Sequence, residues 1–261
     1  MTTIIRALCV TILCWSSTTA IAQGPPILGD KPIMLGANRA VFKTLTEFRK
    51  TNEGIFWRLP AMVHYLPTSN MLVGVYIPMV NYHFADQDAR GGGTTLGDIE
   101  LLYKYQFYRK DGTGKTFRMV AKTLQTLPTG KKLDLEGMST GLYQGYYGIV
   151  AGYESIKYGI SSELGYQWSP LNLQDEVRLK AGIGLPLLKP SYPVNQVNLF
   201  FEYQASYFVE QANFMVLYGQ GIQYAKGRFT FEAALQLPLW QQMEEAKRRQ
   251  YSIYLGMRYV L

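Results

Sequence analysis

Cysteine is almost missing from this chain of 261 residues: Cys9 and Cys14 lie near its start, and none follows. Histidine occurs only at positions 64 and 83, and charged residues make up 17%, below the roughly 25% of an average soluble domain. After the first segment, no apolar run reaches the about 18 residues that indicate a transmembrane helix. These absences exclude disulfide-rich, zinc-thiolate and helical membrane proteins.

The first 22 residues have the composition of a secretory signal peptide. Arg6 precedes an apolar stretch from Ala7 to Trp15, and Ala20-Ile21-Ala22 supplies the small residues of a cleavage site. The apolar stretch is too short for a membrane anchor, which needs about 20 residues. We expect residues 1–22 to be removed by cleavage before Gln23, and both cysteines with them.

What the remaining sequence has in abundance is alternation of apolar and polar residues. The clearest apolar face is that of Tyr251, Ile253, Leu255, Met257, Tyr259 and Leu261. A helix would bring Arg258 onto this face, whereas a strand keeps it on the other. Similar alternation predicts twelve strands, at 38–49, 55–66, 70–83, 95–109, 115–128, 141–153, 156–168, 174–188, 196–209, 212–225, 228–240 and 250–261. The strand at 115–128 alternates poorly, because Val120 and Leu124 share a face with charged residues.

Short turns and long polar connections alternate along the chain. The longest connections are 84–94, 129–140 and 241–249, all at the same predicted end. Outer-membrane barrels show this asymmetry, and the strands of soluble sandwiches are only about 5–6 residues long. The pattern predicts an all-β protein, a transmembrane antiparallel β-barrel of about 12 strands at 38–261. A periplasmic segment at 23–37 precedes it, in the outer membrane of a Gram-negative bacterium.

Charged residues of the predicted strands fall on the face opposite the apolar one. These lumen-lining candidates are Lys43, Glu47, Arg49, Arg58, Asp98, Glu100, Lys104, Arg118, Lys122, Glu163, Glu176, Arg178, Lys180, Glu202, Glu232 and Arg258. An Arg or Lys facing lipid at mid-membrane costs about 2–4 kcal/mol, so the one-sided placement favours a polar interior. Twelve strands lie between filled small barrels and open porins. Both a narrow, mildly basic pore and an interior closed by paired charges remain open.

Aromatic residues and prolines mark special positions on these strands. We expect six aromatic side chains near strand ends to lie at the membrane interfaces, and they are Trp57, Tyr153, Tyr158, Trp168, Trp240 and Tyr259. Five prolines fall inside predicted strands and face inward, at 60, 78, 128, 186 and 238. Proline removes a donor from the ladder, so we predict a bulge or kink at Pro60, which is mid-strand.

Residues for catalysis and metal binding are few. A hydrolase needs a nucleophile with a base, or paired carboxylates, and only His64 or His83 could act as a histidine base. A metal site of His83, Asp86 and Asp88 is conceivable, but these residues also fit a solvated loop. We predict no catalytic residue, no metal site and no cofactor.

Nucleic-acid binding is also a poor interpretation. The formal net charge of +7 falls by one when Arg6 is removed, and the basic clusters Lys131-Lys132 and Lys247-Arg248-Arg249 lie in predicted loops. An exported chain with otherwise scattered basic residues lacks the electrostatic footprint of a nucleic-acid-binding protein.

Several short motifs suggest a family. They are Leu96-Gly97-Asp98-Ile99-Glu100-Leu101 running into Lys104-Tyr105, Leu127-Pro128-Thr129-Gly130, the segment 159–167, and Ala181-Gly182-Ile183-Gly184-Leu185. In these motifs the chain resembles the phenol meta-pathway degradation family of outer-membrane β-barrel transporters. The resemblance covers most of the chain. Leu261 departs from the terminal Phe common in outer-membrane barrels. The resemblance implies a role in moving small hydrophobic or aromatic compounds.

The function predicted from these observations is a channel or transporter in the outer membrane for passive passage of small, hydrophobic or aromatic compounds. The alternative is a closed-lumen structural or interaction barrel that displays its outer loops, and a third hypothesis is an outer-membrane hydrolase. The expected partners are outer-membrane lipid, small-molecule solutes, and the barrel-assembly machinery through the strand 250–261, with no nucleic acid.

Overall fold

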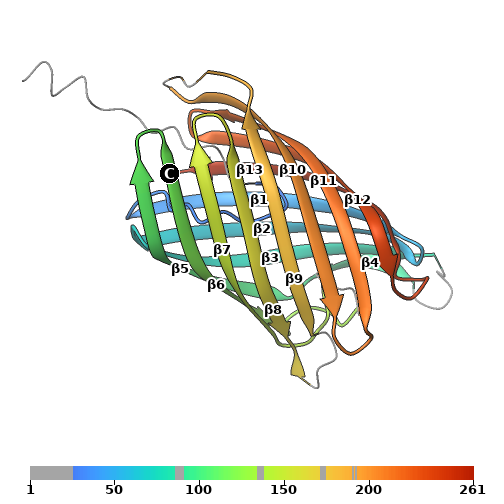
Figure 1. Ribbon diagram of the computed structural model, residues 1–261. Coiled ribbons are helices and arrows are strands. Elements are labelled where there is room, and N and C mark those ends of the chain that lie inside the picture. Colours follow the sequence, from blue (N-terminus) through green and yellow to red (C-terminus); the bar gives the residue numbers. More distant parts are fainter. Residues whose placement is uncertain (1–25, 86–90, 134–137, 171–174, 190, 192) are drawn as a thin grey trace, which may run out of the picture.

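Twelve long antiparallel strands close into a barrel in the computed structural model, which describes residues 26–85, 91–133, 138–170, 175–189, 191 and 193–261 (Figure 1). They are β1 (Arg39–Thr51), β2 (Gly54–Thr68), β3 (Met71–Phe84), β5 (Ile99–Gly112), β6 (Lys115–Leu127), β7 (Gln144–Ser155), β8 (Gly159–Trp168), β9 (Glu176–Pro186), β10 (Asn195–Phe208), β11 (Asn213–Lys226), β12 (Phe229–Gln242) and β13 (Arg249–Val260). Each long strand pairs with its neighbours in the chain, and β1 pairs with β13. The predicted fold class is confirmed.

One predicted strand is divided. The segment expected at 95–109 forms a short strand, β4 (Gly92–Leu96), and then β5, with a break at Gly97 and Asp98. Both pieces pair with β3, so together they occupy one position in the wall. The described residues contain no helix long and apolar enough to cross a membrane.

The outer surface is apolar over the length of the strands. Side chains at alternate positions are exposed, among them Phe42, Leu164 (58% exposed) and Leu255 (51% exposed). Soluble monomers rarely expose apolar patches beyond a few hundred Å². Strands of 10–15 residues are long enough to cross a bilayer at a tilt. The exterior is therefore that of a membrane barrel.

The two ends of the barrel differ. At the short-turn end, most turns between strands are two or three residues long, and the C terminus lies here (Figure 1). The exception at this end is the connection at 187–194. At the long-loop end, the longest connection runs from 128 to 143, and others lie at 169–175 and 243–248.

The prolines are accommodated in different ways. A bulge or kink was expected at Pro60, but Pro60 lies opposite Pro78 with no register shift on either side, so the strand has no bulge there. Instead, pairing with β1 lapses around it, because proline has no N–H to donate. A register shift does occur at Pro238, where Leu239 is the extra residue opposite β11. Pro128 lies after the end of β6, outside the strands.

The interior is occupied by the chain itself. Residues 26–37, called the N-terminal segment below, lie inside the barrel wall. They do not form the separate periplasmic segment expected at 23–37, of which residues 23–25 lie outside the described residues. Its Met34 is buried among inward-facing residues of six strands, namely Val41, Leu66, Leu72, Leu102, Val120 and Val150. This apolar cluster explains why β6 alternates poorly, since Val120 faces another part of the chain and not water. The predicted signal peptide and its cleavage before Gln23 lie outside the described residues.

Candidate functional site

The N-terminal segment follows a track of glycines on the inner wall. A side chain on Gly221 would lie 2.6 Å from Ile27 Cδ1, and one on Gly152 would lie 2.7 Å from Pro32 Cδ. The chain then turns back toward β1 with Gly36 (φ 101°) and Asn38 (φ 54°) in the left-handed region. Glycine and asparagine are the residues that adopt this region most readily. The wall thus has space shaped for this segment.

Backbone groups of the segment bind charged side chains of β9 and β10. The carboxylate of Glu202 accepts hydrogen bonds from the backbone N–H groups of Ile27 (3.2 Å), Leu28 (3.1 Å) and Gly29 (2.6 Å). On the next strand, Lys180 Nζ donates to the carbonyl oxygen of Leu28 at 3.1 Å. Hydrogen bonds to a charged group are about twice as strong as neutral ones.

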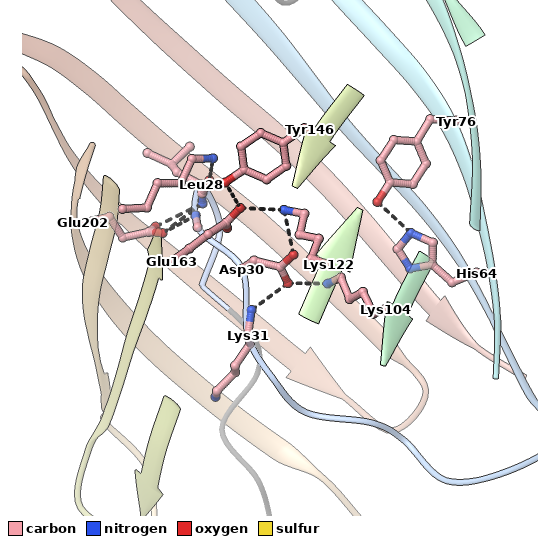
Figure 2. A network of polar contacts seen from close by, with 12 residues as sticks. Leu28, Asp30, Lys31, His64, Tyr76, Lys104, Lys122, Tyr146, Glu163 and Glu202 are labelled. Atoms are coloured by element: carbon pink, nitrogen blue, oxygen red, sulfur yellow. Dashed lines mark hydrogen bonds and ion pairs between the residues drawn. The ribbon is translucent and has the colours of Figure 1, made fainter. Parts of the chain in front are cut away.

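Asp30 lies between two lysines of adjacent strands (Figure 2). Its Oδ1 contacts Lys104 Nζ, and its Oδ2 lies 2.9 Å from Lys122 Nζ. Lys122 also contacts Glu163 Oε1 at 2.9 Å, and that same oxygen accepts a hydrogen bond from the Tyr146 hydroxyl at 2.6 Å. Next to Asp30, the ammonium group of Lys31 pairs with Glu154.

All sixteen lumen-lining candidates are buried or half-buried, and those in strands lie on the inward faces. Away from the N-terminal segment, ion pairs join Arg49 to Glu47 (2.8 Å), Arg58 to Glu100 (2.7 Å), Lys43 to Glu232 (3.5 Å), Arg178 to Glu176, Arg258 to Glu232, and Arg118 to Asp111 (3.9 Å). Charges of both signs thus alternate around the inner wall, and most are paired within it.

Asp98, like Glu202, binds backbone groups, but those of a connection between two strands. Its carboxylate accepts hydrogen bonds from the backbone N–H groups of Gly130 (3.0 Å), Thr140 (2.8 Å) and Gly141 (2.9 Å). A side chain on Gly130 would lie 2.5 Å from the backbone of Gly97, so only glycine fits. The two motifs Leu96–Leu101 and Leu127–Gly130 therefore meet in space, and they fold the 128–143 connection inward.

A cavity of about 560 Å³ opens at the long-loop end. Its apolar lining is Phe56, Met138, Leu142, Phe208, Met215 and Met243. Arg49, Lys132, Lys247 and Arg249 also line it, with two glutamates, Glu53 and Glu244. Its volume is in the range of small-molecule sites. We call this cavity the vestibule.

The two histidines lie on opposite faces of the wall. His64 faces inward with Nε2 3.1 Å from the Tyr76 hydroxyl, and His83 is exposed on the outer face. Among the residues that the structure describes, neither histidine is hydrogen-bonded to a serine or a carboxylate, and no group of three potential metal ligands occurs. Asp86 and Asp88, of the conceivable metal site, lie outside the described residues.

The six aromatic residues expected at the interfaces all project outward, at two levels. Trp57, Trp168 and Trp240 lie toward the long-loop end, whereas Tyr153, Tyr158 and Tyr259 lie toward the short-turn end. Several contact a second aromatic ring, for example Trp57 with Phe48 at 6.3 Å and Tyr259 with Phe229 at 4.7 Å between centroids.

Sequence reasoning missed the residues that the N-terminal segment contributes, above all Asp30 and Lys31. The region before β1 contains turn residues such as Gly29, Pro32 and Gly36, which predict an irregular chain but not its location. Inward-facing glycines such as Gly221 were a usable signal, because a glycine in a strand often marks close approach of another backbone.

The comparisons with known proteins bear on the fold. No family model matches the sequence, and no curated protein matches it. Among solved structures, the chain is similar to the COG4313 outer membrane channel from Pseudomonas putida F1, at 13% identity, with 92% of this chain and 100% of that chain covered and a TM-score of 0.60.

Two porins show the same architecture. The KdgM porin and the NanC porin are each 8% identical to the chain, cover 84% of it over 98% of their own length, and have TM-scores of 0.54 and 0.55. At these identities the similarity shows the fold, which is that of outer-membrane β-barrels.

Proposed function

We propose that the protein is an outer-membrane channel for the passive passage of small solutes. The observation that carries the proposal is the combination of an apolar exterior with a charged inner wall and a vestibule of about 560 Å³ at the long-loop end. A barrel with only a structural role needs no such opening. The similarity of fold to a channel and two porins supports the same function.

The proposal includes the location and orientation of the chain. Cleavage before Gln23 leaves a mature chain without cysteine, and the short-turn end faces the periplasm, as in other outer-membrane barrels. The tryptophans and tyrosines form the two interfacial girdles. The strand expected at 250–261, observed as β13, is the element that the barrel-assembly machinery binds.

The proposed solutes are small hydrophobic or aromatic compounds. The vestibule supports this class because phenylalanine and methionine side chains form much of its wall. Methionine adapts to ligands of different shape and makes favourable contacts with aromatic rings. The resemblance to the phenol meta-pathway degradation family points to the same compounds.

Purified, refolded protein in planar bilayers and in liposomes tests the function. We expect defined conductance steps, and uptake of small solutes into liposomes that contain the protein but not into empty ones. Neither conductance nor uptake, from protein whose β-sheet circular dichroism shows a folded barrel, would refute the channel.

A second candidate is the closed interaction barrel. The N-terminal segment and the ion pairs inside the wall favour it, because they occupy the interior. The two functions differ in one measurement: a folded interaction barrel shows no conductance in planar bilayers, whereas a channel does.

A further inference from the structure

A buried lysine and a half-buried lysine face each other on the inner wall, where like charges repel. Lys104 of β5 and Lys122 of β6 are directly paired across the strands, and both side chains point inward. Lys104 is only 8% exposed. Like charges directly opposite in a sheet are destabilising, so the pair requires negative charge nearby.

The wall supplies only part of that charge. Glu163 of β8 contacts Lys122 at 2.9 Å, and it is also bound by the Tyr146 hydroxyl (Figure 2). Lys180, on the adjacent β9, adds a further positive charge near Glu163. The carboxylate that contacts both lysines is that of Asp30, which belongs to the N-terminal segment and not to the wall.

The geometry at Asp30 is that of a bound carboxylate ligand. Each of its oxygens meets a different ammonium group, Oδ1 with Lys104 and Oδ2 with Lys122. Oδ1 also accepts the backbone N–H of Lys31 at 2.7 Å. A separate small molecule with a carboxylate group would present the same two oxygens to the same two lysines.

The segment that carries Asp30 is not a strand of the barrel. Residues 26–37 form no strand in the structure and are joined to the wall only through β1. They are held by side-chain contacts, chiefly those of Glu202, Lys180 and Glu154, together with the buried Ile27 and Met34. The segment can therefore leave without breaking the ladder of the barrel.

We propose that Lys104 and Lys122 form a carboxylate-binding site inside the barrel, which Asp30 fills in this structure and a solute carboxylate fills when the segment is withdrawn. The site follows from the contacts alone, whereas its use by a passing solute rests on the proposed channel function. The solutes selected at this point are hydrophobic or aromatic compounds that also carry a carboxylate group, a narrower class than hydrophobic compounds in general.

Chemical rescue tests the site without reference to transport. In the variant Asp30→Ala, exchanging chloride for acetate at constant ionic strength should raise the midpoint of heat unfolding by about 2–4 °C, as expected for about 1 kcal/mol in a chain of this size. The wild-type protein, whose site is full, should show no such shift. Acetamide, which is neutral, should rescue neither protein.

The triple variant Asp30→Ala, Lys104→Gln, Lys122→Gln is the matched control, and it should lose the response to acetate. An equal response in the triple variant, or none in Asp30→Ala, would overturn the site. If Asp30→Ala does not fold, deletion of residues 26–34 empties the same site, and the acetate response is measured on that protein, with the same two outcomes.

The reversal potential in bilayers tests the use of the site. We expect the permeability of acetate relative to chloride to be higher in Asp30→Ala than in the wild-type protein. Rescue by acetate together with unchanged relative permeability would leave the site standing and overturn its role in passage. A protein that shows rescue but no conductance at all would refute the channel and not the carboxylate site.

Discussion

Two parts of the chain fold into the barrel, and they are held in different ways. The connection 128–143 is joined to strands at both ends, and the backbone N–H groups of Gly130, Thr140 and Gly141 donate hydrogen bonds to one carboxylate, Asp98. Its Leu133 and Met138 are buried in one apolar cluster with β2 and β3. The N-terminal segment is joined to a strand only at β1, and charged side chains of several strands hold its middle.

This difference separates a fixed part of the interior from an exchangeable one. Buried apolar side chains such as Leu133 and Met138 have no soluble substitute, whereas the carboxylate of Asp30 between two lysines can be replaced by another carboxylate. The described parts of the connection, 128–133 and 138–143, therefore form a fixed part of the vestibule wall, and the N-terminal segment occupies the interior of the barrel. Four experiments test whether the two parts differ in this way.

Deletion of residues 26–34 should have the largest effect. It removes Ile27, Asp30 and Lys31 from the interior while leaving all strands intact. We expect single-channel conductance to rise severalfold in planar bilayers, because the segment occupies the interior between β5 and β11. A folded deletion variant with the conductance of the wild-type protein would show that this segment does not obstruct the passage.

Asp98→Asn should mainly reduce stability. Three backbone N–H groups lose a charged acceptor, so we expect the free energy of unfolding to fall by about 2–4 kcal/mol, with a smaller change in conductance than the deletion produces. Denaturant unfolding measures the loss. Asp111→Asn is the control, because that side chain is 44% exposed and should contribute less than about 0.5 kcal/mol. Equal losses in the two variants would contradict the anchoring of the 128–143 connection.

Gly221→Leu should displace the N-terminal segment without changing a charge. A Cβ at this position would lie 2.6 Å from Ile27 Cδ1, and 2.8 Å from Ala233 O and Ala234 Cβ of β12. Both the segment and the adjacent wall must therefore shift, and we expect a rise in conductance smaller than that of the deletion. A cysteine introduced at Leu28 should then react faster with a water-soluble maleimide. Gly112→Leu is the control, since the nearest contact there is the flexible side chain of Lys115. Unchanged labelling in Gly221→Leu would contradict the close packing.

Glu202→Gln should have the smallest effect of the four. The amide keeps the shape of the side chain but offers the N–H groups of residues 27–29 a weaker acceptor, which should cost about 1–2 kcal/mol of segment docking. Faster labelling of the same cysteine is the measurement. Glu100→Gln is the control, because Glu100 pairs with Arg58 and not with the segment. If both variants label at the same rate, Glu202 does not hold the segment.

Much of the architecture was predictable from the sequence, because each strand carries its own pattern. The apolar and polar faces of β13 or β10 need no partner to be recognised, and the strand lengths alone distinguish a membrane barrel from a soluble sandwich. Alternation, which is a local property, also predicts that the charged side chains lie on the inward face of each strand.

Contacts between distant segments were not predictable. Nothing in Leu96–Leu101 indicates that its aspartate would bind Gly130 and Thr140, and a turn-rich segment before β1 carries no pattern that distinguishes the interior from the periplasm. The bulge expected at Pro60 is absent for a similar reason, since the pairing of its partner strand lapses there instead.

Alternation and strand length are local properties, and they suffice to specify a twelve-stranded barrel with apolar side chains outside and charged side chains inside. Which charges meet depends on the folded chain: Asp30 lies with Lys104 and Lys122, and Glu202 with the backbone of residues 27–29. A charge is buried favourably only when a partner lies nearby. The N-terminal segment, which is not a strand of the wall, meets these partners because the barrel closes around it.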